Sequence, residues 1–355
     1  MARRKNSKKN KEMISLIVIL LIVGTCFGVK KLYDSGLFNK VKDSILKEEK
    51  KLNIIDLNST TRPIGIMIDN VSDAMPQAGL NDAYLIYEII VEGGYTRLFA
   101  LFKDTSPEMI GPVRSLRHYF IDYALENDAV IAHYGWSPKA ESDVKTLGIN
   151  NLNGLTNSGD MYYRDSSITK APHNAFTTMS DIRKQIGNLN YDKKVKDTLL
   201  NYSVDEINLD DMDDAIPANN INIKYSYYQT TSYEYDSENK VYKRINNGKA
   251  QIDRKTNEQN IAKNIIIYNV KNYPLADPED KDRQELDNIG TGNGYFVTNG
   301  YAVPITYEKT SRSSKTKYKY LNGTEIKVND GITYIQIQPT NQSTVINWTN
   351  NKLWL

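Results

Sequence analysis

This chain of 355 residues contains few cysteines and histidines and carries little net charge, and each of these features excludes a class of protein. Cys26 is the only cysteine, so no internal disulfide can form. Three histidines are present, and His133 and His173 have no third ligand at metal spacing. We therefore predict no metal site and no cofactor. The formal net charge of +2 lacks the basic excess that a nucleic-acid partner requires.

The long apolar run of the sequence lies near its N-terminus. Residues 1–12 are rich in lysine and arginine, and residues 13–29 are apolar almost throughout. This pattern predicts a cytoplasmic basic tail and then a single-pass transmembrane anchor, or a signal segment, with the rest of the chain outside the cytoplasm. Cys26 follows Thr25, where a lipoprotein signal has Gly or Ala, so we favour the transmembrane anchor over a lipid on Cys26.

Beyond the anchor, composition divides the chain into a stalk and two domains. Residues 30–61 are charged and mildly amphipathic, which is typical of a partly helical stalk. Segment 203–220 is acidic and loop-like, and it lacks the regular spacing and glycine of a calcium loop, so we interpret it as a linker. We expect an α/β domain over residues 62–202, a second domain over 221–345 and a tail over 346–355.

The α/β domain alternates strand and helix patterns, which predicts a mixed sheet with helices. The apolar run 64–68 ends at Asp69, as in a buried strand with polar residues at its carboxyl end. Pro112 suits the first turn of a helix, and apolar residues repeat at helical spacing from Leu116 to Ala124. After residue 220, alternating residues and Asn-Gly turns predict a β-rich, mainly antiparallel domain.

Charged residues that are costly to bury lie among the apolar runs of the α/β domain. A helix starting at Pro112 would present free N–H groups to an anion beside Arg114 and Arg117, which could clamp it. Convergence of Arg97 and Arg164 on the same place would suit a strongly anionic group. We predict a ligand-binding cleft formed by Asp69, Arg97, Arg114, Arg117, Arg164, His173 and Asn174.

Two other interpretations of these charged residues stay open. Each arginine can pair with a nearby carboxylate in a closed network that fixes the fold and binds nothing. Alternatively, Glu88 and Glu92 can act as paired catalytic carboxylates with His173 as a proton carrier. Glutamates at this spacing are more often ion-pair partners, and Ser115 lacks a nucleophile elbow, so we favour binding over catalysis.

Several motifs occur together in one order along the chain. They are Arg62 to Asn70, Pro76 to Leu80, Val91 to Arg97, Ile110 to Arg117, Tyr163 to Asp165 and Ala171 to Asn174. On these motifs the chain resembles the YerB family, also called the DUF3048 family, over nearly all of residues 62 to 340. The resemblance implies an exported, membrane-attached, often lipid-anchored protein of Gram-positive bacteria, and it supplies no activity to transfer.

Together, the residues and the resemblance predict a membrane-anchored extracytoplasmic binding or regulatory protein of the Gram-positive cell envelope. Its ligand would be an anionic group of peptidoglycan, teichoic acid or a polyprenyl phosphate, or its partner would be a cell-wall enzyme. One alternative is a cell-wall enzyme, either a glycan hydrolase or a phosphotransferase, that uses Glu88 or Glu92. A second alternative is a structural scaffold.

Overall fold

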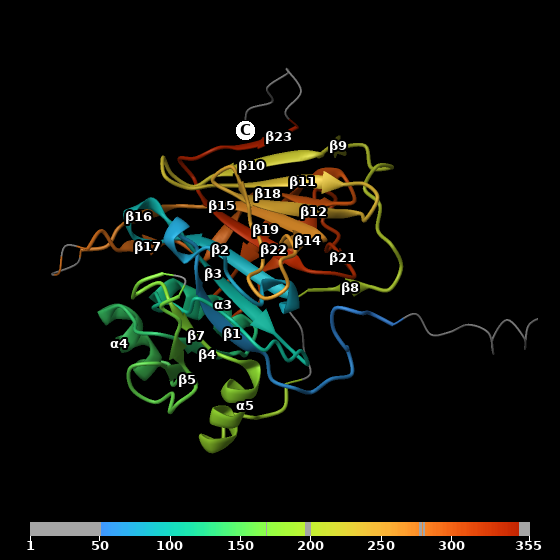
Figure 1. The fold of residues 1–355 in the computed structure, drawn as a ribbon. Helices are drawn as coiled ribbons and strands as arrows, with labels where there is room; N and C mark the ends of the chain where they lie inside the picture. The colour runs from blue at the N-terminus through green and yellow to red at the C-terminus, as the bar shows by residue number, and fades with distance from the viewer. Residues whose placement is uncertain (1–50, 168, 196–199, 277–278, 280, 348–355) are drawn as a thin grey trace, which may run out of the picture. The chain divides into compact units, whose positions relative to one another are not determined.

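The computed structural model describes residues 51–347 apart from 168, 196–199, 277–278 and 280. The predicted basic tail and anchor, most of the stalk and most of the C-terminal tail lie outside the described residues. A compact unit begins at Leu52, inside the predicted stalk (Figure 1). There the N–H groups of Asn53 and Ile54 donate to the Asp330 carboxylate at 2.8 and 2.9 Å. Within the described part of the chain, no helix is long and apolar enough to cross a membrane.

A central mixed sheet runs through the compact unit. Its strands are β1 (Ile64–Asp69), β2 (Leu85–Ile90), β3 (Thr96–Phe102), β4 (Val130–His133), β5 (Asn151–Asn153), β9 (Ile216–Pro217), β15 (Asn264–Val270), β18 (Gly290–Thr298), β19 (Tyr301–Lys309), β20 (Lys317–Tyr320) and β22 (Thr333–Pro339). The order is β20-β19-β18-β15-β22-β2-β3-β1-β4-β5, and β9 pairs with β19. Strand β22 lies between β15 and β2 and is parallel to both. The two predicted domains therefore share one sheet.

A second sheet is antiparallel and lies beside the central one (Figure 1). It contains β10 (Asn220–Lys224), β11 (Thr230–Asp236), β12 (Val241–Asn246), β13 (Lys249–Ala250), β14 (Ile261–Ala262) and β23 (Thr344–Ile346). Three short pairs complete the strands: β6 (Tyr163–Arg164) with β7 (Ala175–Phe176), β8 (Tyr202–Ser203) with β21 (Val328–Asn329), and β16 (Asn272–Pro274) with β17 (Gln284–Leu286). Segment 203–220, predicted as a linker, packs onto this body, because Leu209 and Ala218 are buried.

Three α-helices and three 3-10 turns cover the α/β region. They are α3 (His118–Glu126), α4 (Pro138–Thr146), α5 (Met179–Asn188), η1 (Ser72–Ala74), η2 (Leu80–Asp82) and η3 (Glu92–Gly94), counted over the described residues. Side chains cap the N-termini of α4 and α5: Ser137 Oγ accepts from the Ala140 N–H at 3.3 Å, and Thr178 Oγ1 accepts from the Asp181 N–H at 3.0 Å.

The helix start predicted at Pro112 is wrong, because the chain before α3 is extended. The Arg114 N–H donates to the Met67 carbonyl at 2.9 Å, and the Asp69 N–H donates to the Pro112 carbonyl at 2.9 Å. These bonds hold the segment against the end of β1 and satisfy its backbone groups outside a helix. The first helical residue is His118. An anion beside Arg114 must therefore be bound by side chains rather than by a helix N-terminus.

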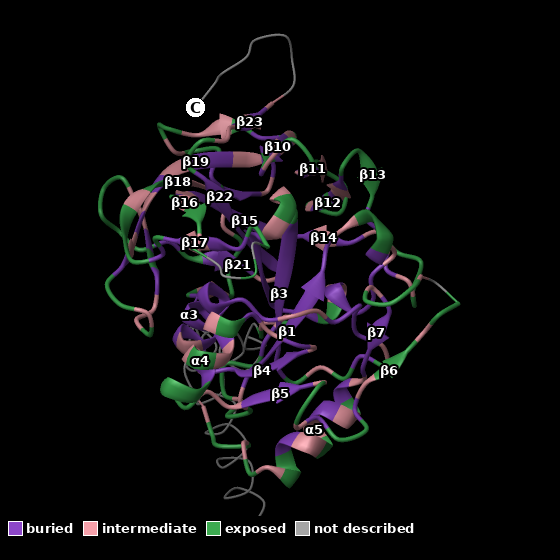
Figure 2. Cartoon of the chain, turned by 90° about the vertical axis from the view of Figure 1, so that its left-hand side faces the viewer, coloured by how far each residue is buried: buried purple, intermediate pink, exposed green. Residues whose placement is uncertain are grey.

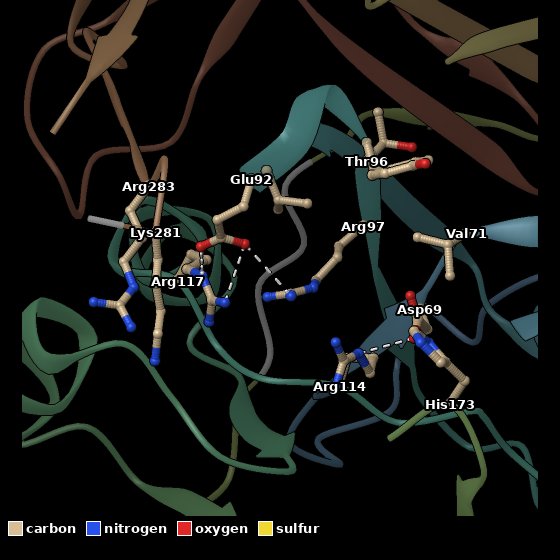
Figure 3. A pocket seen from close by; sticks show the side chains of 12 residues that line it. Asp69, Val71, Glu92, Thr96, Arg97, Arg114, Arg117, His173, Lys281 and Arg283 are labelled. Carbon is tan, nitrogen blue, oxygen red and sulfur yellow. Dashed lines mark hydrogen bonds and ion pairs between the residues drawn. The ribbon is translucent and has the colours of Figure 1, made fainter. Parts of the chain in front are cut away.

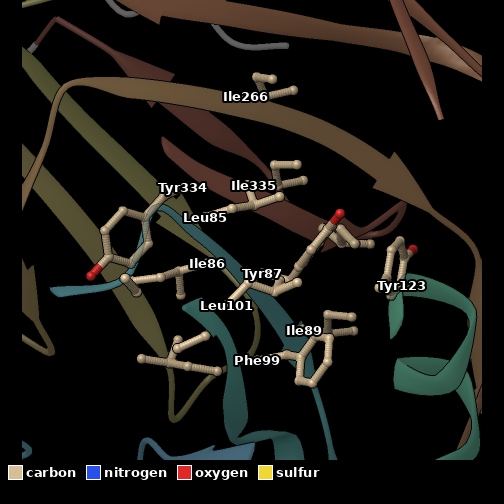
Figure 4. Packing of buried hydrophobic residues seen from close by; sticks show 14 of the residues in the cluster. Leu85, Ile86, Tyr87, Ile89, Phe99, Leu101, Tyr123, Ile266, Tyr334 and Ile335 are labelled. Atoms are coloured by element: carbon tan, nitrogen blue, oxygen red, sulfur yellow. The ribbon is translucent and has the colours of Figure 1, made fainter. Parts of the chain in front are cut away.

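One hydrophobic core extends across both predicted domains. Its aromatic centre contains Tyr87 of β2, whose ring centroid lies 4.7 Å from that of Tyr123 and 6.3 Å from that of Phe99 (Figure 4). The Tyr87 hydroxyl donates to Glu126 at 2.7 Å, so the buried phenol keeps a hydrogen bond. Buried residues follow the central strands, whereas exposed residues concentrate in loops and on α4 and α5 (Figure 2).

Candidate functional site

An open pocket of about 350 Å³ lies where β1 ends and β3 begins (Figure 3). Asp69 is the last residue of β1, and its antiparallel partner in β3 is Arg97. Directly paired residues of neighbouring strands project from the same face, so these two side chains reach the same space. Glu92 enters from η3, between β2 and β3. The rest of the lining comprises Val71, Val91, Tyr95, Thr96, Arg114, Arg117, His173, Lys281 and Arg283.

On one side of the pocket, Glu92 is held between two arginines. Its carboxylate accepts from Arg117 Nε and, at 3.1 Å, from Arg117 Nη2, and Arg97 Nη2 lies 3.5 Å from Oε2. Burial raises the pKa of Glu92, but the charges of Arg97 and Arg117 outweigh it and hold this pKa below its usual value. Burial, with Arg117 adding to it, lowers the pKa of Arg97 to about 9. This side therefore holds two cations on one carboxylate.

The other side of the pocket is built on Asp69, whose side chain is only 2% exposed. Its Oδ2 lies 2.7 Å from His173 Nδ1 and 2.8 Å from Arg114 Nε. Burial opposes the charged carboxylate, but the His173 hydrogen bond and the charges of Arg114 and Arg97 hold the pKa of Asp69 below its usual value. The Arg114 contact is an ion pair without hydrogen-bond alignment. Among the described residues, neither terminal nitrogen of Arg114 has a hydrogen-bond partner.

Lys281 and Arg283, from the segment between β16 and β17, add two more cations that sequence reasoning missed. Both pair with Glu279, Lys281 Nζ at 3.0 Å and Arg283 Nη2 at 2.6 Å. Asp282 between them has a φ of 50°, so the segment is not extended there, and no periodic pattern in the sequence marks these two residues. With them the lining contains five lysines or arginines and two carboxylates. Two acids outside the lining, Glu279 and Asp282, lie beside these cations, and Asp282 Oδ2 accepts from the Gly93 N–H at 3.2 Å.

The pocket brings together most of the predicted ligand-binding residues, namely Asp69, Arg97, Arg114, Arg117 and His173. The structure does not bring Arg164 and Asn174 into the lining. Arg164 Nη1 donates to the Asn174 amide oxygen at 2.8 Å, and its guanidinium lies 4.8 Å from the centroid of the Tyr134 ring. These two residues instead hold the loop that leads into His173.

The two glutamates predicted as a catalytic pair do not face a common space. Glu92 lines the pocket, whereas Glu88 is fully buried between the two sheets. Glu88 Oε2 accepts from Arg244 Nη2 at 2.7 Å, and Oε1 accepts from Thr231 Oγ1 at 2.8 Å. An acid/base pair must reach one substrate, so Glu88 loses its candidacy. Its surroundings are the closed network that was the competing interpretation of the charged residues.

The fold and the pocket define an α/β protein with a mixed central sheet and an arginine-lined site at the end of two adjacent strands. Two sequence profiles match the chain: "Protein of unknown function (DUF3048) N-terminal domain" over residues 52–192, and the corresponding C-terminal domain over residues 221–335. The chain belongs to the DUF3048 family, which confirms the predicted resemblance to YerB.

Two findings connect the chain with YerB of Bacillus subtilis. The protein of strain 168 named "Putative lipoprotein YerB" is 28% identical over 331 residues, which cover 91% of each chain. The crystal structure of YerB protein from Bacillus subtilis matches with a TM-score of 0.69 at 27% identity, and the match covers 79% of this chain and 92% of that one. The similarity therefore includes both predicted domains and the sheet that they share.

Proposed function

We propose that this chain is a membrane-attached, extracytoplasmic protein of the Gram-positive cell envelope that binds a phosphate-bearing ligand in its arginine-lined pocket. The observation that carries the proposal is the excess of cations over carboxylates in an open pocket. Arginine forms bidentate, charge-assisted hydrogen bonds with phosphate, and the terminal nitrogens of Arg114 have no partner among the described residues.

A phosphate fits the charge of this pocket better than a single carboxylate does. Asp69 and Glu92 already neutralise part of the arginine charge, and a dianionic phosphoryl group compensates more of the remainder than a monoanion does. Pockets of 300 to 1,000 Å³ are typical of small-molecule sites, so the volume of about 350 Å³ accommodates a phosphate with one attached unit. Teichoic acids and polyprenyl phosphates are envelope molecules with this chemistry.

The rim of the pocket supports a ligand that carries a ring or an apolar group beside its phosphate. Tyr95 lines the pocket and stacks on Tyr228, with ring centroids 6.0 Å apart. Tyr228 is 60% exposed, and the neighbouring Tyr227 is 88% exposed. Exposed tyrosines offer a rigid apolar face with a polar tip, which suits contact with a sugar ring or a lipid chain.

Attachment to the membrane is supported from two directions. The N-terminal sequence carries a basic stretch followed by an apolar run, and the YerB relative is named as a lipoprotein. These observations favour different anchors, a helix or a lipid at Cys26, and either anchor is consistent with the proposed extracytoplasmic position of the compact unit.

The proposal is tested by calorimetric titration of the purified full-length chain with inorganic phosphate, glycerol 3-phosphate, glucose 1-phosphate and acetate. We expect saturable binding of the phosphates, weaker binding of acetate and tightest binding of glucose 1-phosphate. Arg114→Gln should weaken phosphate binding at least about tenfold, because a charge-assisted hydrogen bond contributes about 1.5–3 kcal/mol.

The matched control is Arg183→Gln, which removes an arginine of α5 that donates to Ser106 and the Thr105 carbonyl outside the pocket. It should leave phosphate affinity unchanged. The proposal is overturned if the wild-type chain binds none of the phosphates, or if the two substitutions weaken binding equally.

A further inference from the structure

We propose that Asp69 and His173 form a general-base dyad that hydrolyses a phosphoester or phosphoanhydride bond of the ligand held by the pocket arginines. This inference rests on the proposed function, because the arginines must first bind the phosphoryl group. It extends that function from binding to turnover. The dyad also replaces the predicted Glu88 and Glu92 pair with two residues that share one pocket.

The geometry of the dyad leaves one basic atom free. His173 Nδ1 lies 2.7 Å from Asp69 Oδ2, so Nδ1 donates its proton to the buried carboxylate and the lone pair resides on Nε2. Among the described residues, Nε2 has no hydrogen-bond partner, and the side chain is 23% exposed and lines the pocket. A carboxylate that fixes the histidine tautomer in this way is the arrangement that makes imidazole a positioned base.

His133 shows how a structural histidine is held in the same protein. It is fully buried, and both of its ring nitrogens face oxygen atoms, the Gly135 carbonyl at 2.8 Å and Asn151 Oδ1 at 3.1 Å. Water does not reach either nitrogen of that ring. His173 differs in both respects, since it has solvent access and a ring nitrogen without a partner.

The anion-binding arginines are tied to the same carboxylate as the base. Arg114 Nε lies 2.8 Å from Asp69 Oδ2, the oxygen that also contacts His173. Arg97 is the strand partner of Asp69. A phosphoryl group held by Arg114 and Arg97 is therefore placed next to His173, and positioning of this kind, together with electrostatic stabilisation, is most of what phosphoryl transfer requires.

The loop that carries His173 is held on both sides by backbone bonds. The Asp165 N–H donates to the Asn174 carbonyl at 2.9 Å, and the Val113 N–H donates to the Ala175 carbonyl at 2.6 Å. Val113 precedes Arg114 in the chain, so the base and the anion-binding arginine are joined by one short link. Arg164, which donates to the Asn174 side chain, becomes a positioning residue for this loop rather than a ligand-binding one.

The reaction consumes one water molecule. His173 Nε2 accepts a proton from water while the water oxygen forms a bond to phosphorus, and the bond from phosphorus to the leaving oxygen breaks. The proton on Nε2 is then released to solvent, and the departing oxygen takes up a proton from solvent, because the leaving oxygen lies opposite the attacking water. The products are phosphate and an alcohol from a monoester, a phosphomonoester and an alcohol from a diester, or two phosphates from pyrophosphate. Arg97 and Arg114 stabilise the charge that develops on the phosphoryl oxygens.

The test measures phosphate or nitrophenol release by the full-length chain from p-nitrophenyl phosphate, bis(p-nitrophenyl) phosphate and inorganic pyrophosphate. These substrates represent a monoester, a diester and an anhydride. We expect turnover of at least one, and His173→Gln should lower it about 100-fold or more, the usual contribution of a general base. Calorimetric titration of His173→Gln with phosphate separates a loss of turnover from a loss of ligand binding.

Asp69→Asn tests the positioning residue through the pH–rate profile. Wild-type turnover should rise with pH, because a general base must be unprotonated to act, and Asp69→Asn should shift that rise as well as lower the rate. Thermal unfolding of each variant shows whether the fold is kept, and the conservative variant His173→Asn gives a second measurement if His173→Gln does not fold.

The outcomes separate the two proposals. Phosphate binding without turnover of any of the three substrates by the wild-type chain overturns the dyad and leaves the binding function standing. Turnover that persists in both His173 variants also overturns the dyad. Absence of both binding and turnover overturns the proposed function itself.

Discussion

Glu88 and Glu92 are close in the sequence, and each accepts hydrogen bonds from an arginine. They differ in solvent access, since one lies in the core and the other at an open pocket. Glu88 is fully buried, as is its partner Arg244, and Asn70, Thr96 and Thr231 use its second oxygen. Glu92 is 19% exposed and is shared by Arg97 and Arg117 at an open pocket. The first pair is closed, whereas the second retains positive charge that faces solvent.

The difference teaches which charged residues are free to act. Glu88 belongs to β2 of the central sheet, and its partners Thr231 and Arg244 belong to β11 and β12 of the second sheet, so the closed network joins the two sheets. Its hydrogen bonds all join groups of the fold, and only Arg244 Nε among its buried guanidinium atoms is left without a partner in the described residues. In the open cluster the cations outnumber the carboxylates, so binding capacity is left over for a ligand.

The strongest test of this contrast breaks the closed pair. Arg244→Met leaves the Glu88 carboxylate buried without its cation, and we expect a loss of about 3–5 kcal/mol in the free energy of unfolding, measured by urea denaturation. The double substitution Glu88→Gln with Arg244→Met removes both charges and should recover part of that loss. A change below about 1 kcal/mol in the single variant would contradict a closed, fully desolvated pair.

The buried histidine His133 should make the stability of the fold depend on pH. Burial lowers the pKa of His133 to about 4, although hydrogen bonds with Gly135 and Asn151 oppose the shift. The unfolded chain, with a pKa near 6.5, takes up the proton first, so stability is full above about pH 6.5 and falls towards pH 4. We expect the free energy of unfolding to fall by about 3 kcal/mol between these two pH values because of His133.

Urea denaturation of wild type and His133→Gln between about pH 7 and about pH 4 checks this expectation. Other groups titrate in both proteins, so the informative quantity is the difference between the two pH profiles. That difference should shrink as the pH falls, because only the wild type loses the His133 contribution. Parallel profiles would show that His133 does not titrate between these limits.

Much of the local fold could be predicted from the sequence. The apolar run 64–68 identified a buried strand, and the helical spacing from Leu116 to Ala124 identified most of α3, because periodicity is a local signal. The helix start at Pro112 failed because Met67 and Asp69, distant in sequence, bond to the segment from Pro112 to Arg114. The shared sheet was missed for the same reason, since β22 pairs with β2 across most of the chain.

The site was predicted to the extent that it lies close to one stretch of sequence. Its polar residues lie among apolar runs, where a charged side chain is costly to bury and therefore indicates a partner or a site. They are Asp69, Arg97, Arg114, Arg117 and His173. Lys281 and Arg283 stand in a charged segment, where lysine and arginine are ordinary, so composition gave no contrast. The division of Glu88 from Glu92 depended on Arg244 and Thr231, and no local pattern connects those residues with β2.

The smallest expected effect on stability comes from a substitution of Glu92 in the open pocket. Glu92→Gln removes a carboxylate that competes with the ligand for Arg97 and Arg117, and the pocket is open enough for water and anions to reach the arginines. We expect a loss of about 1 kcal/mol or less in the free energy of unfolding, far below that of Arg244→Met. Phosphate affinity should rise about threefold to tenfold, because two guanidinium groups gain net charge and donors. Calorimetric titration and urea denaturation with and without phosphate measure both quantities. A large loss of stability that phosphate does not restore would place Glu92 with Glu88, as part of the fold rather than of a binding site.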